Sequence, residues 1–222
     1  MKKDTRLLQK QLELINRRWP HLHQQLAAAQ TEQLQVDIIN NTTLAIDGIQ
    51  LTSAQDREAE AKLQADQISP QEPVIYLYGP ALGDCARLLL RRKTLKRLHI
   101  IILNRAVFLE SLARKKQEWP DDLRVELHIP DEKDDIFCPF IVNPAELVLA
   151  EEKSFILRDR LELELNSAYI QKRHSAGDSV TQKRIAANQS FLAEDRDISF
   201  FDRLPQKTVF IAAAGPTLED HL

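Results

Sequence analysis

With 222 residues, the chain is long enough for one large domain or two small ones. Charged residues make up 28% and hydrophobic residues 43%, as in ordinary soluble domains, and the net charge of -3 gives no reason to expect a nucleic-acid partner. No apolar stretch approaches the roughly 20 residues that span a bilayer, and the N-terminus lacks the apolar core of a signal peptide. The two cysteines, Cys85 and Cys138, are far apart in the sequence and fit a reducing cytoplasm.

Residues 1–68 predict a small N-terminal subdomain of helices and a β-meander. The dipeptide Asp47-Gly48 is a strong hairpin signal between two short apolar runs. Ser53, followed three residues later by Asp56, resembles a capping box at the start of a helix. The predicted helices are 3–18, 21–31 and 53–67, and the predicted strands lie around 38–39, 44–46 and 49–51.

Residues 69–150 predict a Rossmann-like α/β domain, in which helices flank a parallel sheet. Val74–Tyr78 is an unbroken apolar run, typical of a strand that is buried on both faces. A glycine turn, a helical pattern over 84–93 and a second apolar run over 99–103 complete a βαβ pattern, so the two runs should be adjacent parallel strands. Further along, we expect a helix at 105–118, a half-exposed strand at 124–129, and strands at 140–142 and 147–149.

The turn after the first strand is a candidate ligand loop. Its spacing, Gly79-x-x-x-Gly83, is neither the three-glycine dinucleotide fingerprint nor a P-loop. Asp84 argues against a phosphate here, because a carboxylate would repel it. Asn104 ends the second strand, where a ribose-binding enzyme often carries an acid, although an amide can still hydrogen-bond a hydroxyl. Two interpretations stay open: a small-ligand site, or glycines that only permit a tight turn.

Residues 151–205 predict a helical linker, and 206–222 predict the start of a second α/β domain. The linker should hold helices over 151–172 and 179–203, separated by a polar break at 174–178. An apolar strand then runs into Gly215-Pro216-Thr217, after which five residues remain. We therefore expect the chain to be a fragment of a longer protein. The residues expected to face inward from the first linker helix are Phe155, Ile156, Leu161, Leu165 and Tyr169.

Three stretches together resemble the motility accessory factor (Maf) family, bacterial proteins linked to the glycosylation of flagellin. Leu51–Ala59 resembles the family's serine-containing segment, and Tyr76–Asp84 is similar to its N-terminal nucleotide-fold loop. Phe210–Leu218 is similar to the motif that opens the family's central domain, which itself resembles a pterin pyrophosphokinase and sialyltransferases. The chain departs from the family at several positions: Pro80 and Ala81 in the first loop, Asn104, Ala213 and Thr217.

The resemblance implies a transferase that moves a nonulosonic acid from a CMP-sugar to a serine or threonine of flagellin. Gly215, Pro216 and Thr217 would bind the donor: the glycine admits a phosphate, the proline fixes φ, and the threonine supplies a hydroxyl. Alternatively, Thr217 is only a helix cap, with Asp220 closing a capping box. The catalytic base is not assigned, and the chain as given is expected to be an inactive scaffold or acceptor-recognition part, with self-association left open.

Two other enzyme classes remain as alternatives. One is an S-adenosylmethionine-dependent methyltransferase-like enzyme with its ligand at Gly79–Gly83, and the other is a pyrophosphokinase-type nucleotide-binding enzyme. The sequence requires no cofactor. Because the six histidines show no metal-ligand spacing with the cysteines, we expect no metal site. The acidic run 131–135 and the basic run 87–97 are interpreted as solvated segments.

Overall fold

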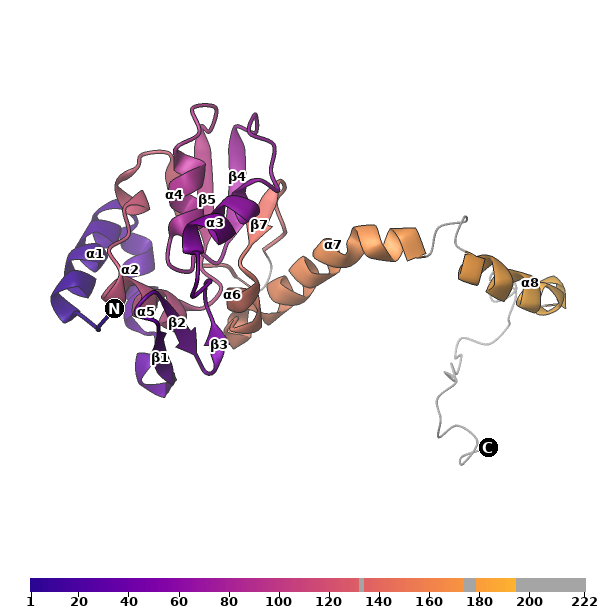
Figure 1. The fold of residues 1–222 in the computed structure, drawn as a ribbon, viewed down its shortest axis with the longest axis horizontal. Coiled ribbons are helices and arrows are strands. Elements are labelled where there is room, and N and C mark those ends of the chain that lie inside the picture. The colour runs from indigo at the N-terminus through magenta and orange to yellow at the C-terminus, as the bar shows by residue number, and fades with distance from the viewer. Residues whose placement is uncertain (132–133, 174–178, 195–222) are drawn as a thin grey trace, which may run out of the picture. The chain divides into compact units, whose positions relative to one another are not determined.

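The computed structural model describes residues 1–131, 134–173 and 179–194 (Figure 1). Contacts within the chain group Met1–Asn166 as one compact unit and Ser167–Leu222 as a second. The predicted domain boundaries within the first unit stay predictions. The break at 174–178 and everything after 194, including Gly215, Pro216 and Thr217, lie outside the described residues.

The N-terminal part combines helices with a three-stranded antiparallel sheet of order β1-β2-β3, which confirms the predicted small α+β region. One helix start differs from the prediction: the cap is Asp56, whose side chain accepts from the N–H of Ala59. Ser53 instead closes a turn, since its hydroxyl accepts from the N–H of Gln55 and of Asp56. The elements are α1 (Thr5–Arg18), α2 (Pro20–Ala27), η1 (Thr31–Gln33), β1 (Val36–Ile39), β2 (Thr43–Ile46), β3 (Ile49–Gln50) and α3 (Arg57–Ala65).

A four-stranded parallel sheet of order β6-β5-β4-β7 forms the centre of the unit, which confirms the predicted Rossmann-like fold. The two apolar runs are adjacent parallel strands, with Tyr76 paired to His99 and a helix between them, as predicted. The strand order reverses between β4 and β7, because the chain leaves β4 toward β5 and later returns to the other side of β4. The elements are β4 (Val74–Tyr78), α4 (Asp84–Leu90), β5 (Arg97–Ile101), α5 (Arg105–Arg114), η2 (Trp119–Asp121), β6 (Val125–His128) and β7 (Phe140–Val142).

Several predicted boundaries were wrong in this region. The strand expected at 147–149 is part of helix α6 (Pro144–Val148), because Asn143 caps the N–H of Glu146 and proline favours the first helical position. Helix α4 ends at Leu90 and α5 at Arg114, both earlier than expected. Strand β5 begins two residues before the predicted run.

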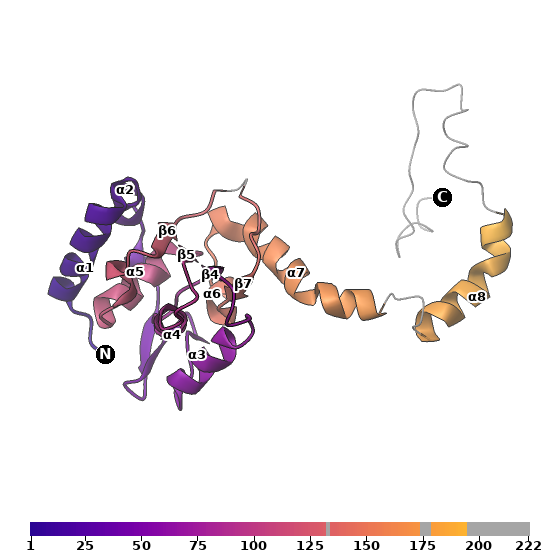
Figure 2. The same cartoon turned by 90° about the horizontal axis from the view of Figure 1, so that it is seen from above.

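The two faces of the parallel sheet are covered differently. One face packs Ile75, Leu77 and Ile100 into the largest buried cluster, together with side chains from α1 to α5. On the other face, Leu157 and Leu161 of α7 cover Tyr78, Ile101 and Val142, near the carboxyl ends of the strands. Figure 2 shows α3 and α4 on one side of the strand row and the first turns of α7 on the other. The described residues between β6 and β7 contain no helix.

The C-terminal helices are η3 (Glu152–Ser154), α7 (Phe155–Arg173) and α8 (Ser179–Glu194), which confirms the predicted helical linker. The residues that face the core are Leu157 and Leu161, both nearly inaccessible to solvent. Phe155, Ile156 and Leu165 were expected to face inward, but all three are exposed. The prediction assumed a helix that is buried along its whole length. Within the described ranges, no helix is long and apolar enough to cross a membrane.

Candidate functional site

The glycine loop after β4 packs against the chain's own side chains. Gly79, Ala81 and Gly83 all have positive φ, at 77°, 47° and 79°. A Cβ atom added to Gly79 would lie 2.7 Å from the Cβ atom of Glu146, and one added to Gly83 would overlap the side chain of Gln117. The two glycines therefore allow the positive φ angles of the turn, and their lack of a side chain leaves room for Glu146 and Gln117.

Glu146 of α6 occupies the position that an anionic ligand of the loop would take. Its Oε1 atom accepts a hydrogen bond from the Ala81 N–H, whereas its Oε2 atom is buried with no partner in the described structure. Burial raises the pKa of Glu146 from 4.5 to about 7, against the lowering effect of the Ala81 bond. The loop thus holds a carboxyl group of the protein itself.

The other two loop candidates, Asp84 and Asn104, are also engaged inside the protein. Asp84 accepts from Arg57 through one oxygen and from Lys115, at 2.6 Å, through the other. Asn104 caps α5 through its Oδ1 atom and donates from Nδ2 to the carbonyl of Leu149, at 2.6 Å. Gly79, Gly83, Asp84 and Asn104 therefore lie at the carboxyl edge of the sheet, as expected, but each is used within the fold.

Little space remains at the point where the strand order reverses, which is where open α/β sheets usually bind ligands. The cavity between the glycine loop, α3 and Asn143 has a volume of only about 10 Å³, room for about one water molecule. The segment after α6 also crosses this edge, since the Glu151 N–H donates to the carbonyl of Leu103. In the described structure, S-adenosylmethionine at Gly79–Gly83 would have to displace this segment.

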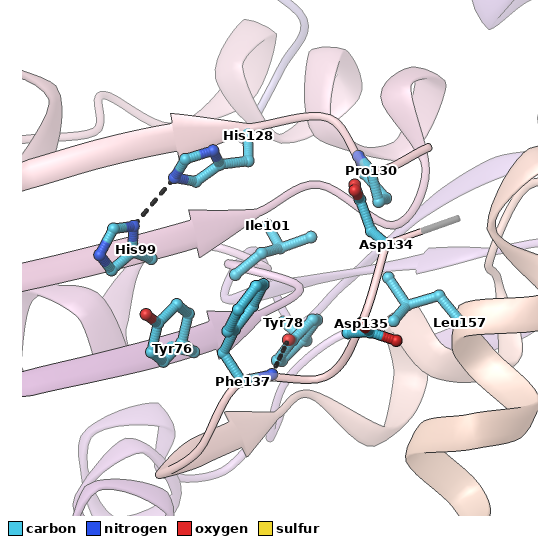
Figure 3. Close-up of a pocket in the computed structure, with 10 residues that line it drawn as sticks. All are labelled: Tyr76, Tyr78, His99, Ile101, His128, Pro130, Asp134, Asp135, Phe137 and Leu157. Carbon is cyan, nitrogen blue, oxygen red and sulfur yellow. Dashed lines mark hydrogen bonds between the residues drawn. The ribbon is translucent and has the colours of Figure 1, made fainter. Parts of the chain in front are cut away.

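A larger cavity of about 250 Å³ lies on the second face of the sheet (Figure 3). Strands β4, β5 and β6 supply its floor, the segment that leads to β7 supplies one wall, and α7 closes one end with Leu157. Cavities for drug-sized ligands have volumes of about 300 to 1,000 Å³, so this one suits a one- or two-ring molecule. Its lining residues are Tyr76, Tyr78, His99, Ile101, His128, Pro130, Asp134, Asp135, Phe137 and Leu157.

Four rings form a continuous row in this cavity. Tyr76 stacks on His99 with ring centroids 4.6 Å apart and planes 9° apart, because the two residues are register partners on parallel strands. Phe137 stacks on Tyr76 at 5.2 Å, and His128 stacks on His99 at 5.2 Å. Such offset arrangements stabilise the rings beyond the area that they bury. The row gives the cavity an aromatic surface at its helix-free end.

The two histidines favour the neutral state. His99 Nδ1 and His128 Nε2 lie 2.9 Å apart in a hydrogen bond, which requires that at least one of the two nitrogens is unprotonated. Burial lowers the pKa of both rings, and the proximity of His128 lowers the pKa of His99 further. The pair therefore presents hydrogen-bonding groups rather than a positive charge at neutral pH.

The opposite end of the cavity carries two carboxylates. Asp134 accepts the N–H of Asp131 at 2.8 Å, and Asp135 pairs with Arg160 at 3.4 Å. Both are exposed, and they lie across the aromatic floor from the histidines (Figure 3). The inner rings Tyr76 and His99 are stacked between their neighbours, so a ligand in this cavity would meet their edges, and only the end rings Phe137 and His128 keep an outer face. It would also meet histidine nitrogen atoms at one end and carboxylate oxygens at the other.

The sequence analysis missed this site. The acidic run was interpreted as a solvated segment, and the histidines were considered only as metal ligands. In the described ranges, no three histidine, cysteine, aspartate or glutamate residues come together as a metal site. Part of the signal was available in the sequence, since Tyr76 and His99 were both placed on adjacent parallel strands. Their pairing was not predicted, because the second strand was expected to begin at His99, whereas β5 begins two residues earlier. The position of Phe137 depended on the path of the following loop.

These observations define the class: a Rossmann-like α/β unit with a filled glycine loop and an aromatic pocket on one sheet face. No family model and no curated protein matches the sequence. The solved structures that resemble it include spermidine synthase from Thermotoga maritima, with a TM-score of 0.42 and 19% identity over 53% of this chain and 45% of that chain. Another is spermidine synthase in complex with the transition state analogue AdoDATO, with a TM-score of 0.41 and 19% identity over 52% and 46%.

The predicted function, part of a Maf-like flagellin glycosyltransferase, is contradicted by these comparisons. The solved structures named above are spermidine synthases and not glycosyltransferases. Flagellin, a nucleotide sugar and self-association gain no support as partners. At this identity the likeness concerns the fold alone, and the chain spans less than half the length of these structures. The family resemblance itself stays an expectation.

Proposed function

We propose that residues 1–166 bind a planar nitrogen heterocycle, of the nucleobase or nucleoside class, in the pocket over the second face of the sheet. The observation that carries the proposal is the aromatic row that runs from Phe137 through Tyr76 to His99 along a cavity of about 250 Å³. An end ring of the row, such as Phe137, can stack a flat ligand on its outer face, because every base presents a π-face. The proposal keeps the nucleotide-binding alternative but places the ligand away from Gly79–Gly83.

The polar groups of the pocket fit such a ligand. Neutral histidines can donate or accept, and the carboxylates of Asp134 and Asp135 accept from exocyclic amino groups or ring N–H groups. Two carboxylates beside neutral imidazoles disfavour an anionic ligand, so a free base or nucleoside is preferred over its phosphate. The volume is too small for a dinucleotide.

The test is calorimetric titration of the full chain with adenosine, guanosine, cytidine and S-adenosylmethionine. We expect one nucleoside to bind, and Tyr76→Ala to weaken its binding by at least about tenfold. The loss of this inner ring removes the support of Phe137, and a base stacked on an aromatic ring gains about 1–3 kcal/mol. Tyr76→Phe should retain most of the affinity. Phe155→Ala, which removes an exposed ring outside the pocket, is the matched control.

Two results would contradict the proposal. One is the absence of nucleoside binding at millimolar concentration by a folded protein. The other is an equal effect of Tyr76→Ala and Phe155→Ala. Binding of S-adenosylmethionine that Tyr76→Ala leaves intact would move the site to the glycine loop and favour the methyltransferase-like alternative.

A further inference from the structure

A second cavity of about 250 Å³ lies beside the first turn of α4, on residues that the aromatic pocket does not use. Its walls come from the end of the glycine loop, from α4 and from the segment that follows α5. Three of its side chains are cationic and two are acidic. The lining residues are Leu82, Gly83, Asp84, Arg87, Lys115, Lys116, Gln117 and Glu118.

The negative charge of Asp84 is balanced by two cationic side chains of the protein. Arg57 donates to its Oδ2 atom through Nε at 2.9 Å and through Nη2, and Lys115 donates to Oδ1 at 2.6 Å. Its side chain is only 9% exposed. The repulsion that Asp84 would exert on an anion is therefore offset by two cations in direct contact with it.

The charges around the cavity leave a positive excess. The cations in or beside the cavity are Arg57, Arg87, Lys115 and Lys116. The acidic residues are Asp84, Glu118 and Glu58, and Glu58 lies 3.5 Å from Arg87. Four positive charges against three negative ones leave an excess of one. Lys116 is exposed and makes no ion pair in the described structure. Burial lowers the pKa of Lys115, and a bound anion would counteract this lowering by favouring the charged amine.

A buried amide adds a neutral donor. Gln117 is 4% exposed and accepts from the indole N–H of Trp119 through its Oε1 atom, at 3.2 Å. Its side-chain nitrogen makes no hydrogen bond in the part of the chain that the structure describes, although the residue lines the cavity. This amide is available as a donor to a ligand in the cavity, and phosphate oxygens accept strongly from both amide and cationic groups.

We propose that this cavity binds the phosphate group of a small phosphorylated ligand, held by Arg87, Lys115 and Lys116 with the Gln117 amide as an additional donor. The site is separate from the aromatic pocket and does not depend on the function proposed for it. Arg87 offers a planar guanidinium that can take two phosphate oxygens, and the lysines act as point charges.

The experiment is calorimetric titration of the full chain with inorganic phosphate and with pyrophosphate, in a buffer free of other polyvalent anions. The test variant is R87Q/K116Q, which removes two cations and leaves the Arg57 and Lys115 bonds to Asp84 in place. We expect it to weaken binding by roughly tenfold or more, because each hydrogen bond to a charged group contributes appreciably. The control is Lys96→Gln, which removes one exposed charge outside the cavity.

Loss of affinity in R87Q/K116Q, with Lys96→Gln within about twofold of the wild type, would support the site. Tighter binding of pyrophosphate would indicate a diphosphate ligand, and equal binding a monophosphate. Absence of binding of either anion at millimolar concentration would overturn the proposal, as would equal losses in the test and control variants. Thermal midpoints of all proteins ensure that only folded protein is compared.

Discussion

Glu146 illustrates how one side chain can decide what a loop does. A carboxyl group with one bonded oxygen and one buried, unpaired oxygen is costly to ionise. Because it lies against Gly79 and Ala81, the glycine loop packs directly on helix α6. The same contact explains why the glycine has no room for a side chain.

The titration of Glu146 predicts a specific pH dependence of stability. In the folded state the pKa of Glu146 is raised from 4.5 to about 7, so the folded protein holds this proton more tightly than the unfolded chain does. The resulting stabilisation of the folded state is fully present below pH 4.5 and is lost as the pH rises through 7. Glu146→Gln removes the titration, so the variant should be more stable than the wild type at pH 8, by up to about 3 kcal/mol.

Urea denaturation at pH 4 and pH 8 measures this difference. At pH 4 the wild-type residue is protonated, so the two proteins should be close in stability. Glu32→Gln, at an exposed position, is the control and should leave the pH profile unchanged. A constant difference between wild type and Glu146→Gln at both pH values would show that the carboxyl group is not titrating in this range.

At the scale of elements, caps and short connections position the strands' carboxyl ends. Asn104 and Asn143 each cap the helix that follows a strand, and their amide nitrogens donate to the carbonyls of Leu149 and Leu51. The residues therefore do two tasks, capping their own helix and holding a neighbouring segment. These hydrogen bonds hold the segments that cover the carboxyl edge of the sheet against the helices that begin there.

Replacing Asn104 should separate the two tasks. Asn104→Ala loses the cap of α5 and leaves the Leu149 carbonyl without its donor, so we expect a loss of about 2 kcal/mol. Asn104→Asp keeps an acceptor for the cap but removes the donor, so its stability should lie between those of Asn104→Ala and the wild type. Denaturant midpoints of the three proteins provide the measurement, and an aspartate variant less stable than alanine would argue against the capping role.

At the scale of the whole molecule, the buried clusters all lie within the first compact unit. The last residue in any of them is Leu161, and the unit itself ends at Asn166. The stability of this unit should therefore not depend on the residues that follow it, as far as the described part of the chain shows.

A protein ending at Asn166 should therefore fold by itself. We expect its thermal midpoint to lie within about 2 °C of the main transition of the full chain, which corresponds to less than about 1 kcal/mol for a unit of this size. Differential scanning calorimetry of both proteins tests this. A decrease of about 5 °C or more would mean that residues after 166 contribute to the core.

The sequence by itself determined the first two strands of the parallel sheet and their pairing. Val74–Tyr78 and the run after it are apolar without alternation, and a glycine turn with a helical pattern lies between them, so local chemistry was enough to predict a parallel βαβ unit. The antiparallel meander followed similarly from Asp47-Gly48. The ends of elements were harder to predict. Asp56 caps α3 where Ser53 was expected to do so, because several neighbouring side chains can accept a hydrogen bond from the first N–H groups of a helix.

Only the tertiary structure decided what fills the loop and which side chains meet on the second face of the sheet. Nothing near Gly79 in the sequence indicates that Glu146, 67 residues later, fills the loop, because such a contact depends on the path of the chain after β7. In the same way, the aromatic row brings Phe137 onto Tyr76 from a segment without regular structure. Hydrophobic periodicity reports which face of an element is buried, whereas the partner on that face is set by long-range packing.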